Sequence, residues 1–228
     1  HLESYKSALA CDPISAFGGV VSCNYKINKS LAVELNKLFL EVIVSNGFDK
    51  EALKLLKKKK NLRLIDATNY SLKEILRFIS ANEEVLIQTE DFNKFNIRDF
   101  KVVSKKKPNS KQMKNLIFAF NICRYVKSNA IVLATNETTV GIGSGQPSRL
   151  DSCQIAIEKM KKFIKVKDEV VAASDAFFPF TDGIEKLVQS GVTAVIQPSG
   201  SIRDKEIINF ANETDTVLVF SKTRHFRH

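Results

Sequence analysis

The sequence lacks any long run of apolar residues. No stretch of about 18 consecutive apolar residues occurs, so no transmembrane helix is expected. Its opening segment, HLESYKSALACD, mixes charged residues into an amphipathic pattern, which is not that of a secretory signal. Apolar residues nevertheless make up 44% of the 228 residues, and charged residues 26%. This balance excludes a disordered or low-complexity protein and supplies enough apolar material for a core.

Cysteine and histidine are scarce. None of the three histidines lies near a cysteine, and the four cysteines never form a CxxC pair: Cys11, Cys23, Cys123 and Cys153. A structural zinc site needs such clustered ligands, so we predict no structural metal. Isolated cysteines in a chain of this size are typical of reduced, buried thiols, and we predict a cytoplasmic protein.

Acidic residues are outnumbered by basic ones. The chain has 35 Lys and Arg against 25 Asp and Glu, a formal charge of +10, which attracts nucleic acid, anionic membranes or small polyanions. The lysine runs at 57–60 and 105–107 lack the interleaved aromatic and arginine side chains that stack on bases. We interpret them as solvated surface and as cations near helix C-termini. We therefore predict no nucleic-acid or membrane partner, and a salt-dependent nucleic-acid binder remains the minor alternative.

Short apolar runs alternate with amphipathic segments along the chain. This rhythm predicts an α/β fold with helices on both faces of a sheet. Helices are expected at 2–10, 31–38 (capped by Ser30), 50–59, 71–79, 111–126, 148–164, 182–190 and 202–212. Strands are expected at 20–22, 42–44, 62–65, 85–88, 101–103, 130–134, 139–142, 170–173, 193–196 and 216–220. The polar, proline-bearing stretch 104–110 is the best linker, which divides the chain into lobes 1–107 and 108–228.

One glycine-bearing segment, GIGSGQPSR at 141–149, joins a predicted strand to a predicted helix. Its three glycines allow the backbone to approach an anion at a helix N-terminus, and Arg149 is able to bind a carboxylate or phosphate. The alternative is a tight connection with a solvated arginine. The spacing matches neither a P-loop nor a Rossmann motif.

A second segment, SDAFFPFTD at 174–182, combines three phenylalanines with two carboxylates at a strand end. Aromatic rings there are able to sandwich a flat heterocycle while an aspartate binds its N–H groups. Alternatively the phenylalanines fill the core and Asp182 caps the next helix. The two interpretations are compatible if some of the phenylalanines fill the core and others bind a ligand.

Three further segments are polar or glycine-bearing. Each is considered as a ligand contact but also has a purely structural interpretation. Ser201 in PSGS would be an N-cap, the C-terminal RHFRH a frayed end, and DPISAFGG at 12–19 an ordinary turn. The chain has no evident Ser/His/Asp or Cys/His triad. No single motif decides the function.

Taken together, the motifs closely resemble the C-terminal part of the bifunctional purine biosynthesis proteins, which join an IMP cyclohydrolase domain to an AICAR transformylase domain. The resemblance covers essentially the whole chain, in the family's order, and rests on ALACDPISAFGGVV, VKSNAIVLA, TVGIGSGQPSR, SDAFFPFTDG, VIQPSGSIRD and RHFRH. It implies two cytidine-deaminase-like lobes without zinc, the first one incomplete. It also implies formyl transfer from 10-formyltetrahydrofolate to the 5-amino group of AICAR, giving FAICAR, at a site shared within a homodimer.

The resemblance also implies roles for individual residues. Those expected at AICAR are Gly18, Glu41, Asn129, Phe177 and Arg224, the last of them near the phosphate. Those expected at the folate are Arg149, Leu150, Asp182, Ser201 and Ile202. His228 is expected close to the carboxamide and the reacting amine, so Asn129 and His228 are the predicted catalytic residues.

The sequence departs from the family's pattern in several places. The family's Lys-His pair lies upstream of the segment matching Leu2–Gly19 and is absent here, as is the cyclohydrolase domain. Glu83 and Glu84 replace a usual glycine pair, and Thr181 stands where some members carry arginine. We therefore expect a fragment that keeps much of the binding surface with little or no turnover. The alternative is a non-catalytic nucleotide-binding module.

Overall fold

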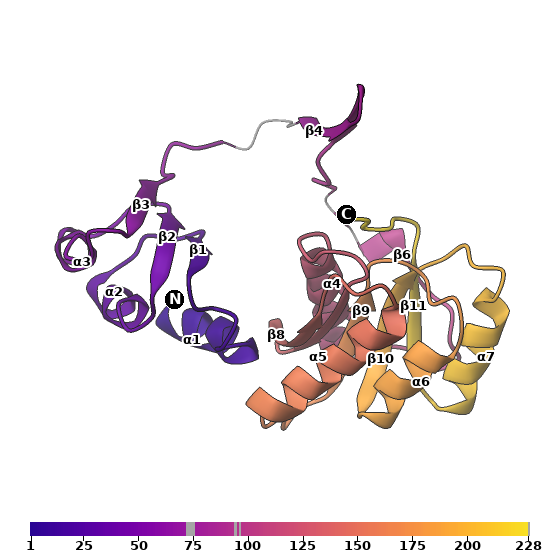
Figure 1. Cartoon of the computed structure of the whole chain (residues 1–228). Coiled ribbons are helices and arrows are strands. Elements are labelled where there is room, and N and C mark those ends of the chain that lie inside the picture. Colours follow the sequence, from indigo (N-terminus) through magenta and orange to yellow (C-terminus); the bar gives the residue numbers. More distant parts are fainter. Residues whose placement is uncertain (72–75, 94, 96, 228) are drawn as a thin grey trace. The chain divides into compact units, whose positions relative to one another are not determined.

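The computed structural model describes residues 1–71, 76–93, 95 and 97–227 (Figure 1). The chain forms two compact units, unit 1 at His1–Glu90 and unit 2 at Asp91–His228. In the described part of the chain no helix is both long enough and apolar enough to cross a membrane.

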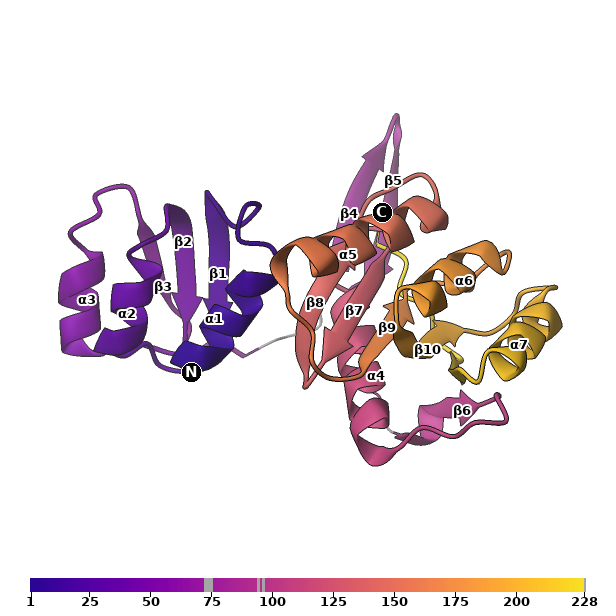
Figure 2. The ribbon, with the colours of Figure 1, turned by 90° about the horizontal axis from the view of Figure 1, so that it is seen from below.

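Unit 1 contains a three-stranded parallel sheet in the order β1-β2-β3 (Figure 2). Its strands are β1 (Gly19–Cys23), β2 (Leu40–Ser45) and β3 (Arg63–Asp66). Its helices are α1 (Leu2–Cys11), α2 (Lys29–Leu35) and α3 (Lys50–Leu56). All three helices contribute to one core with the sheet. The opposite face carries Val20 and Ile65, which are exposed, so the prediction of helices on both faces is wrong for this sheet among the described residues.

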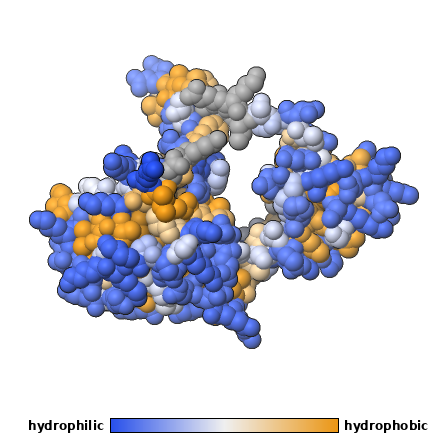
Figure 3. Space-filling view, turned by 180° about the vertical axis from the view of Figure 1, so that it is seen from behind, coloured by the Kyte–Doolittle hydropathy of each residue, from blue (hydrophilic) through white to orange (hydrophobic). Residues whose placement is uncertain are grey.

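A β-hairpin completes unit 1. It consists of β4 (Leu76–Ala81) and β5 (Glu84–Thr89), which pair antiparallel with Phe78 opposite Ile87. The predicted helix at 71–79 is therefore wrong at Leu76–Ile79, while residues 72–75 lie outside the described part. Apolar residues on two facing strands, joined by a short turn in which Asn82 has φ 56°, favour a hairpin over a helix. Apolar side chains of this hairpin are exposed (orange in Figure 3).

Unit 2 is built on a six-stranded mixed sheet in the order β6-β11-β10-β9-β7-β8. Its strands are β6 (Phe100–Val102), β7 (Ile131–Thr135), β8 (Thr138–Gly143), β9 (Val170–Ser174), β10 (Val192–Pro198) and β11 (Val217–Ser221). Its helices are η1 (Ile97–Asp99), α4 (Ser110–Cys123), α5 (Arg149–Phe163), α6 (Asp182–Gln189) and α7 (Asp204–Glu213). Strands β9, β10 and β11 are parallel, whereas β7 is antiparallel to both of its neighbours.

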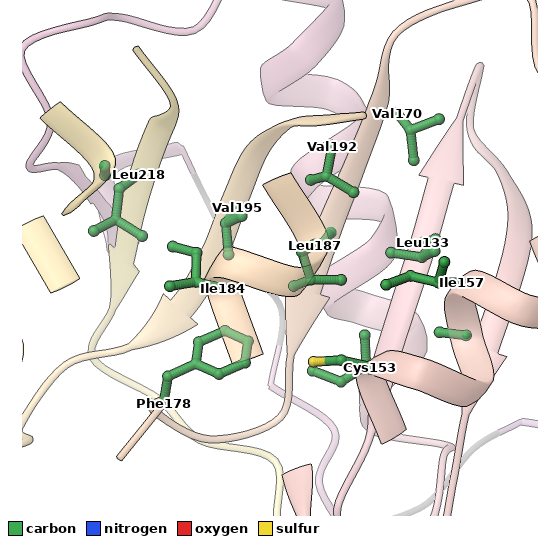
Figure 4. Close-up of a cluster of buried hydrophobic side chains, with 14 of the residues drawn as sticks. Leu133, Cys153, Ile157, Val170, Phe178, Ile184, Leu187, Val192, Val195 and Leu218 are labelled. Atoms are coloured by element: carbon green, nitrogen blue, oxygen red, sulfur yellow. The ribbon is translucent and has the colours of Figure 1, made fainter. Parts of the chain in front are cut away.

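Helices cover both faces of the unit 2 sheet, as predicted. Along β9, Val170 and Ala172 belong to the core shared with α5, α6 and α7, part of which Figure 4 shows. Val171 and Ala173 belong to a second core shared with α4. Successive residues of a strand point to opposite faces, so a continuous apolar run fits a strand that is buried on both sides.

The sequence position at which the two compact units divide differs from the predicted lobe boundary. Strand β6, inside the predicted first lobe 1–107, pairs antiparallel with β11 of unit 2. The units divide between Glu90 and Asp91. The assignment of 1–107 and 108–228 to two transformylase lobes stays a prediction.

Two local predictions have clear outcomes. The side chain of Asn28, not Ser30, caps α2 by accepting a hydrogen bond from the backbone N–H of Leu31 at 3.0 Å. In the lysine run at 57–60, the Nζ of Lys59 donates to the carbonyl oxygens of Asn36 and Leu38 at 2.7 and 2.9 Å. This lysine therefore satisfies backbone acceptors, in agreement with the structural interpretation of the run.

Candidate functional site

The predicted motifs of unit 2 converge on one edge of its sheet. The parallel strands β9, β10 and β11 end at this edge and lead into the segments at 174–182, 198–201 and 222–227. Because β7 is antiparallel to β9, and β8 to β7, the start of β7 and the end of β8 lie at the same edge. The carboxyl ends of strands are where α/β sheets bind ligands.

A cavity of about 450 Å³ opens at this edge. It is lined by Asn129, Pro147, Ser148, Arg149, Leu150, Ala176, Phe177, Phe178, Pro179, Phe180, Asp182, Gly183, Arg224 and Phe226. Six of these were predicted site residues: Asn129, Phe177 and Arg224 for AICAR, and Arg149, Leu150 and Asp182 for the folate. The structure thus brings together residues from four separate motifs.

The other predicted site residues lie elsewhere. Ser201 and Ile202 follow β10 but do not line the cavity. Gly18 and Glu41 belong to unit 1, and His228 lies outside the described residues. The roles of all these residues stay predictions.

Asn129 is held by the loop that follows β8. Its Nδ2 donates to the carbonyl oxygens of Gln146 and Pro147, both at 3.0 Å. Its own backbone carbonyl accepts a hydrogen bond from the Ser152 hydroxyl at 2.7 Å. Since both amide hydrogens have partners, the side chain offers a ligand its acceptor oxygen.

Arg149 is buried, so the alternative of a solvated arginine is wrong. Its Nη1 donates to the carboxylate of Asp175 at 2.9 Å, and its Nε donates to the carbonyl of Phe177 at 3.3 Å. Burial lowers the pKa of Arg149, and the neighbouring Asp175 opposes that shift. Asp175 also accepts the Ser128 hydroxyl at 2.6 Å, which makes it a central support of the cavity wall.

Asp175 is one of the two carboxylates of the aromatic motif, but no supporting role beside Arg149 was predicted for it. It is completely buried, and a buried charge requires partners of this kind. The available signal was its position directly after the buried strand β9, where the chain enters the aromatic motif.

Two of the three glycines in the 141–149 segment serve packing. A Cβ at Gly141 would lie 2.2 Å from the carbonyl oxygen of Ala156, and one at Gly143 would lie 1.9 Å from that of Ser152. Strand β8 therefore approaches the backbone of α5 more closely than any side chain allows. The interpretation of these two glycines as a cradle for an anion is not needed.

All three phenylalanines of the aromatic motif border the cavity, and Phe178 also fills the core. Phe178 is 1% exposed and packs with Cys153 and Ile184 (Figure 4). Its ring occupies the space that a Cβ at Gly183 would need, at 2.7 Å. Phe177 and Phe180 line the cavity. The core interpretation is therefore confirmed for Phe178, whereas the binding of a flat heterocycle by Phe177 and Phe180 stays a prediction.

Asp182 and Ser201 do not act as N-caps. Asp182 is the first residue of α6, after the N-cap Thr181, and its Oδ1 accepts from the backbone N–H of Gly183 at 2.7 Å. The N-cap of α7 is Arg203, whose N–H donates to the Ser201 hydroxyl oxygen at 3.1 Å. Ile202 is fully exposed.

The C-terminal tail, residues Lys222–Arg227, packs on unit 2, so the alternative of a frayed end is wrong for these residues. Arg224 and Phe226 line the cavity, whereas His225 between them is buried. The backbone N–H of Ser128 donates to the carbonyl oxygen of Arg227 at 2.9 Å, and the backbone N–H of Arg227 donates to the Ser128 hydroxyl oxygen at 3.1 Å. The tail is thereby fixed beside Asn129.

The four cysteines are buried thiols outside any disulfide, as predicted. Burial raises the pKa of the Cys153 thiol to about 12, so this group is inert rather than nucleophilic. Within the described ranges, no group of three or more His, Cys, Asp or Glu side chains converges in a way that could hold a metal ion.

Comparison with known proteins gives a consistent result. A family model described as AICARFT/IMPCHase bienzyme matches residues 1–159. Proteins named bifunctional purine biosynthesis protein PurH match almost the whole chain. The one from Persephonella marina is 43% identical over 228 residues, and the one from Fusobacterium nucleatum is 44% identical over 225 residues. In each comparison 99% of this chain is aligned with 44% of the relative, so the chain spans less than half the length of these relatives.

Proposed function

The chain belongs to the AICARFT/IMPCHase bienzyme family, and from this membership we propose that it takes part in purine biosynthesis as part of the AICAR transformylase. The reaction is formyl transfer from 10-formyltetrahydrofolate to the 5-amino group of AICAR, which gives FAICAR. The observation that carries the proposal is the cavity of about 450 Å³, lined by six residues that the family resemblance assigns to AICAR or the folate. This volume is within the usual range for small-molecule sites.

The chemistry requires a site that orients a weak nucleophile. The lone pair of the AICAR amine is delocalised into the imidazole ring and its carboxamide. Transfer therefore needs a fixed geometry, a proton acceptor and stabilisation of charge on the formyl oxygen. The free acceptor oxygen of Asn129 suits an N–H of the amine or the carboxamide.

The remaining AICAR contacts follow from residue type. The Phe177 ring is suited to pack on the flat imidazole, and the Arg224 guanidinium is suited to the phosphate. Both line the same cavity as Asn129. Gly18 and Glu41 are the other proposed AICAR contacts.

The folate is proposed to lie near the helix N-termini of unit 2. Leu150 and Asp182 line the cavity within the first turns of α5 and α6, where backbone N–H groups remain available. Arg149, Ser201 and Ile202 are the other proposed folate contacts. A chain with a net charge of +10 attracts a phosphate and a polyanionic folate tail.

Several finer features belong to the same proposal. The lobes are of the cytidine-deaminase-like type without zinc, the site is shared within a homodimer, and the protein is cytoplasmic. His228 assists proton transfer. Residues 1–228 alone bind both substrates but turn over little, because the Lys-His pair of the family is not among them.

A formyl-transfer assay tests the proposal. Release of tetrahydrofolate from 10-formyltetrahydrofolate would be followed with AICAR present, for this chain and for a chain extended to the length of its relatives. We expect turnover in the extended chain, and AICAR binding by both. Asn129→Ala should abolish turnover in the extended chain, whereas the control Lys222→Ala, outside the cavity lining, should not.

The outcomes separate the alternatives. Binding of AICAR without turnover in an extended, folded chain would favour the non-catalytic nucleotide-binding module. Equal affinity for AICAR and unrelated polyanions, falling steeply with salt, would favour a nucleic-acid binder.

A further inference from the structure

The C-terminal tail presents two side chains to the cavity and hides the one between them. Arg224 is exposed, His225 is 2% exposed and Phe226 is 43% exposed. The guanidinium of Arg224 lies 5.0 Å from the centre of the Phe226 ring. Neither residue is buried against the core, so their positions depend on what holds the tail itself.

The side chain of His225 packs into the interior of unit 2. Its ring lies 4.4 Å from that of Phe120 and 5.4 Å from that of Phe95, centre to centre. Its Nδ1 is hydrogen-bonded to the carboxylate of Asp91. Its backbone N–H donates to the carbonyl of Asp175 at 2.9 Å. One residue thus joins the tail to α4, to the start of unit 2 and to the residue that pairs with Arg149.

Burial favours a neutral imidazole at His225. Burial lowers its pKa, Asp91 and Asp175 oppose this, and Arg124 adds to it. Arg124 lies beside Asp91 at 4.0 Å and donates to the carbonyls of Asp91 and Asn93 at 3.2 and 2.7 Å. The Asp91 carboxylate already has a cation nearby, so a neutral ring donating its Nδ1–H suffices.

Packing alone does not require a histidine here. A phenyl ring would fill the same aromatic surroundings but would remove the imidazole N–H that bonds Asp91. The Nδ1 bond to Asp91 is therefore a contact between the tail and the start of unit 2 that a phenyl ring would not make.

We propose that His225 is a positioning residue of the site: its bond to Asp91 and its aromatic surroundings fix the tail so that Arg224 and Phe226 face the cavity. It acts through Arg224, and so on the phosphate end of the ligand. The identity of that ligand rests on the proposed function, whereas the anchoring of the tail does not.

A double-mutant cycle on this chain tests the proposal. Affinities for AICAR and for its phosphate-free riboside would be measured by calorimetry for the wild type, His225→Phe, Arg224→Ala and the double variant. We expect His225→Phe to weaken AICAR binding about tenfold, the scale of one lost charge-assisted hydrogen bond, with little effect on the riboside. The double variant should be hardly weaker than Arg224→Ala, because residues that act through one another are not additive.

Hydrogen exchange provides a readout that does not need the ligand. The amide of Arg227 is bonded to the Ser128 hydroxyl and should exchange about tenfold faster in His225→Phe, while amides of β9 keep their protection. Asp91→Ala removes the same bond without changing the tail and should act alike. His225→Asn keeps an N–H near the Nδ1 position and should restore part of the protection. Lys222→Ala is the matched control within the tail.

The results that overturn the proposal are distinct from those that overturn the function. Additive losses in the cycle, or equal losses for AICAR and the riboside, would exclude action through Arg224. Unchanged exchange at Arg227 in both His225→Phe and Asp91→Ala would exclude the anchor. A wild-type chain that binds no AICAR would overturn the proposed function, and the exchange experiment alone would then decide the anchor.

Discussion

The two units differ in how their sheets are covered. In unit 2, α4 packs on one face and α5, α6 and α7 on the other. In unit 1 the helices share one core with the sheet, and the opposite face leaves Ile65 48% exposed. A sheet held from both sides fixes the ends of its strands, and precise sites are built on such rigid elements. The cavity with its six predicted residues lies at an edge of the doubly covered sheet.

Unit 2 also tolerates buried charge. The ion pair of Arg149 and Asp175 is almost completely buried, with side chains 8% and 0% exposed. Such a pair contributes little net stability compared with apolar residues, but the loss of one partner is costly. The pair therefore fixes the position of Arg149 beside the cavity, and substitution of either partner should be poorly tolerated.

The largest expected effect comes from breaking this pair. Asp175→Ala should lower the unfolding free energy of unit 2 by about 3–5 kcal/mol, because it leaves the Arg149 guanidinium buried without its carboxylate. Urea unfolding followed by hydrogen exchange resolves the two units. Unit 1 should keep its stability.

The matched control for this experiment is Asp151→Ala. Asp151 is an exposed acid in the first turn of α5, where its loss should cost about 1 kcal/mol or less. Similar losses for the two variants would show that burial of the Asp175 pair is not what makes unit 2 sensitive.

A matched pair of isoleucines tests the one-sided sheet of unit 1. Ile43, which is 0% exposed, faces the helices, and Ile43→Ala should cost about 2–5 kcal/mol. Ile65 faces the other way, and Ile65→Ala should cost about 1 kcal/mol or less. Thermal unfolding of the two variants makes the comparison. Equal costs would mean that the second face is covered in solution.

The smallest expected effect is on pH dependence. The pKa of His225 is lowered from 6.5 by burial, so the unfolded chain binds more protons than the folded one between the two pKa values. Stability of unit 2 should then be fully present above about pH 6.5 and fall as the pH drops below it, by at most about 1.4 kcal/mol per pH unit. Melting temperatures from pH 5 to 8 should show this slope in the wild type and a reduced slope in His225→Phe. His225 faces Asp91, Arg124 and Asp175. An equal slope in the wild type and in His225→Phe would show that other groups cause the pH dependence.

Much of unit 2 was predictable from local pattern. The strand at 170–173 and the helix at 182–190 appear as β9 (Val170–Ser174) and α6 (Asp182–Gln189), because apolar runs and helix boundaries leave local signals. The first strand of the hairpin was predicted as a helix, because a short apolar segment fits both periods, whereas the second was correctly predicted as a strand at 85–88. The pairing of the first strand with β5 decided the matter, because the pattern within 71–79 alone does not show which segment it faces.

The candidate site was predictable in its members but not in its supports. The family resemblance and the strand-end positions pointed to Asn129, Phe177 and Arg224, which line one cavity. The sequence pattern left open which phenylalanine fills the core, and Phe178 does so only because Gly183 leaves room for its ring.

Local periodicity, turn chemistry and motif order are properties of the chain itself, and by themselves they determined the α/β class, most elements of unit 2 and the loops that carry the motifs. Only the tertiary structure decided that Arg149 pairs with Asp175, 26 residues away, and that His225 bonds Asp91, 134 residues away. The reason is physical: a buried polar group must find a partner in space, and which partner it meets depends on how the sheet brings distant segments together.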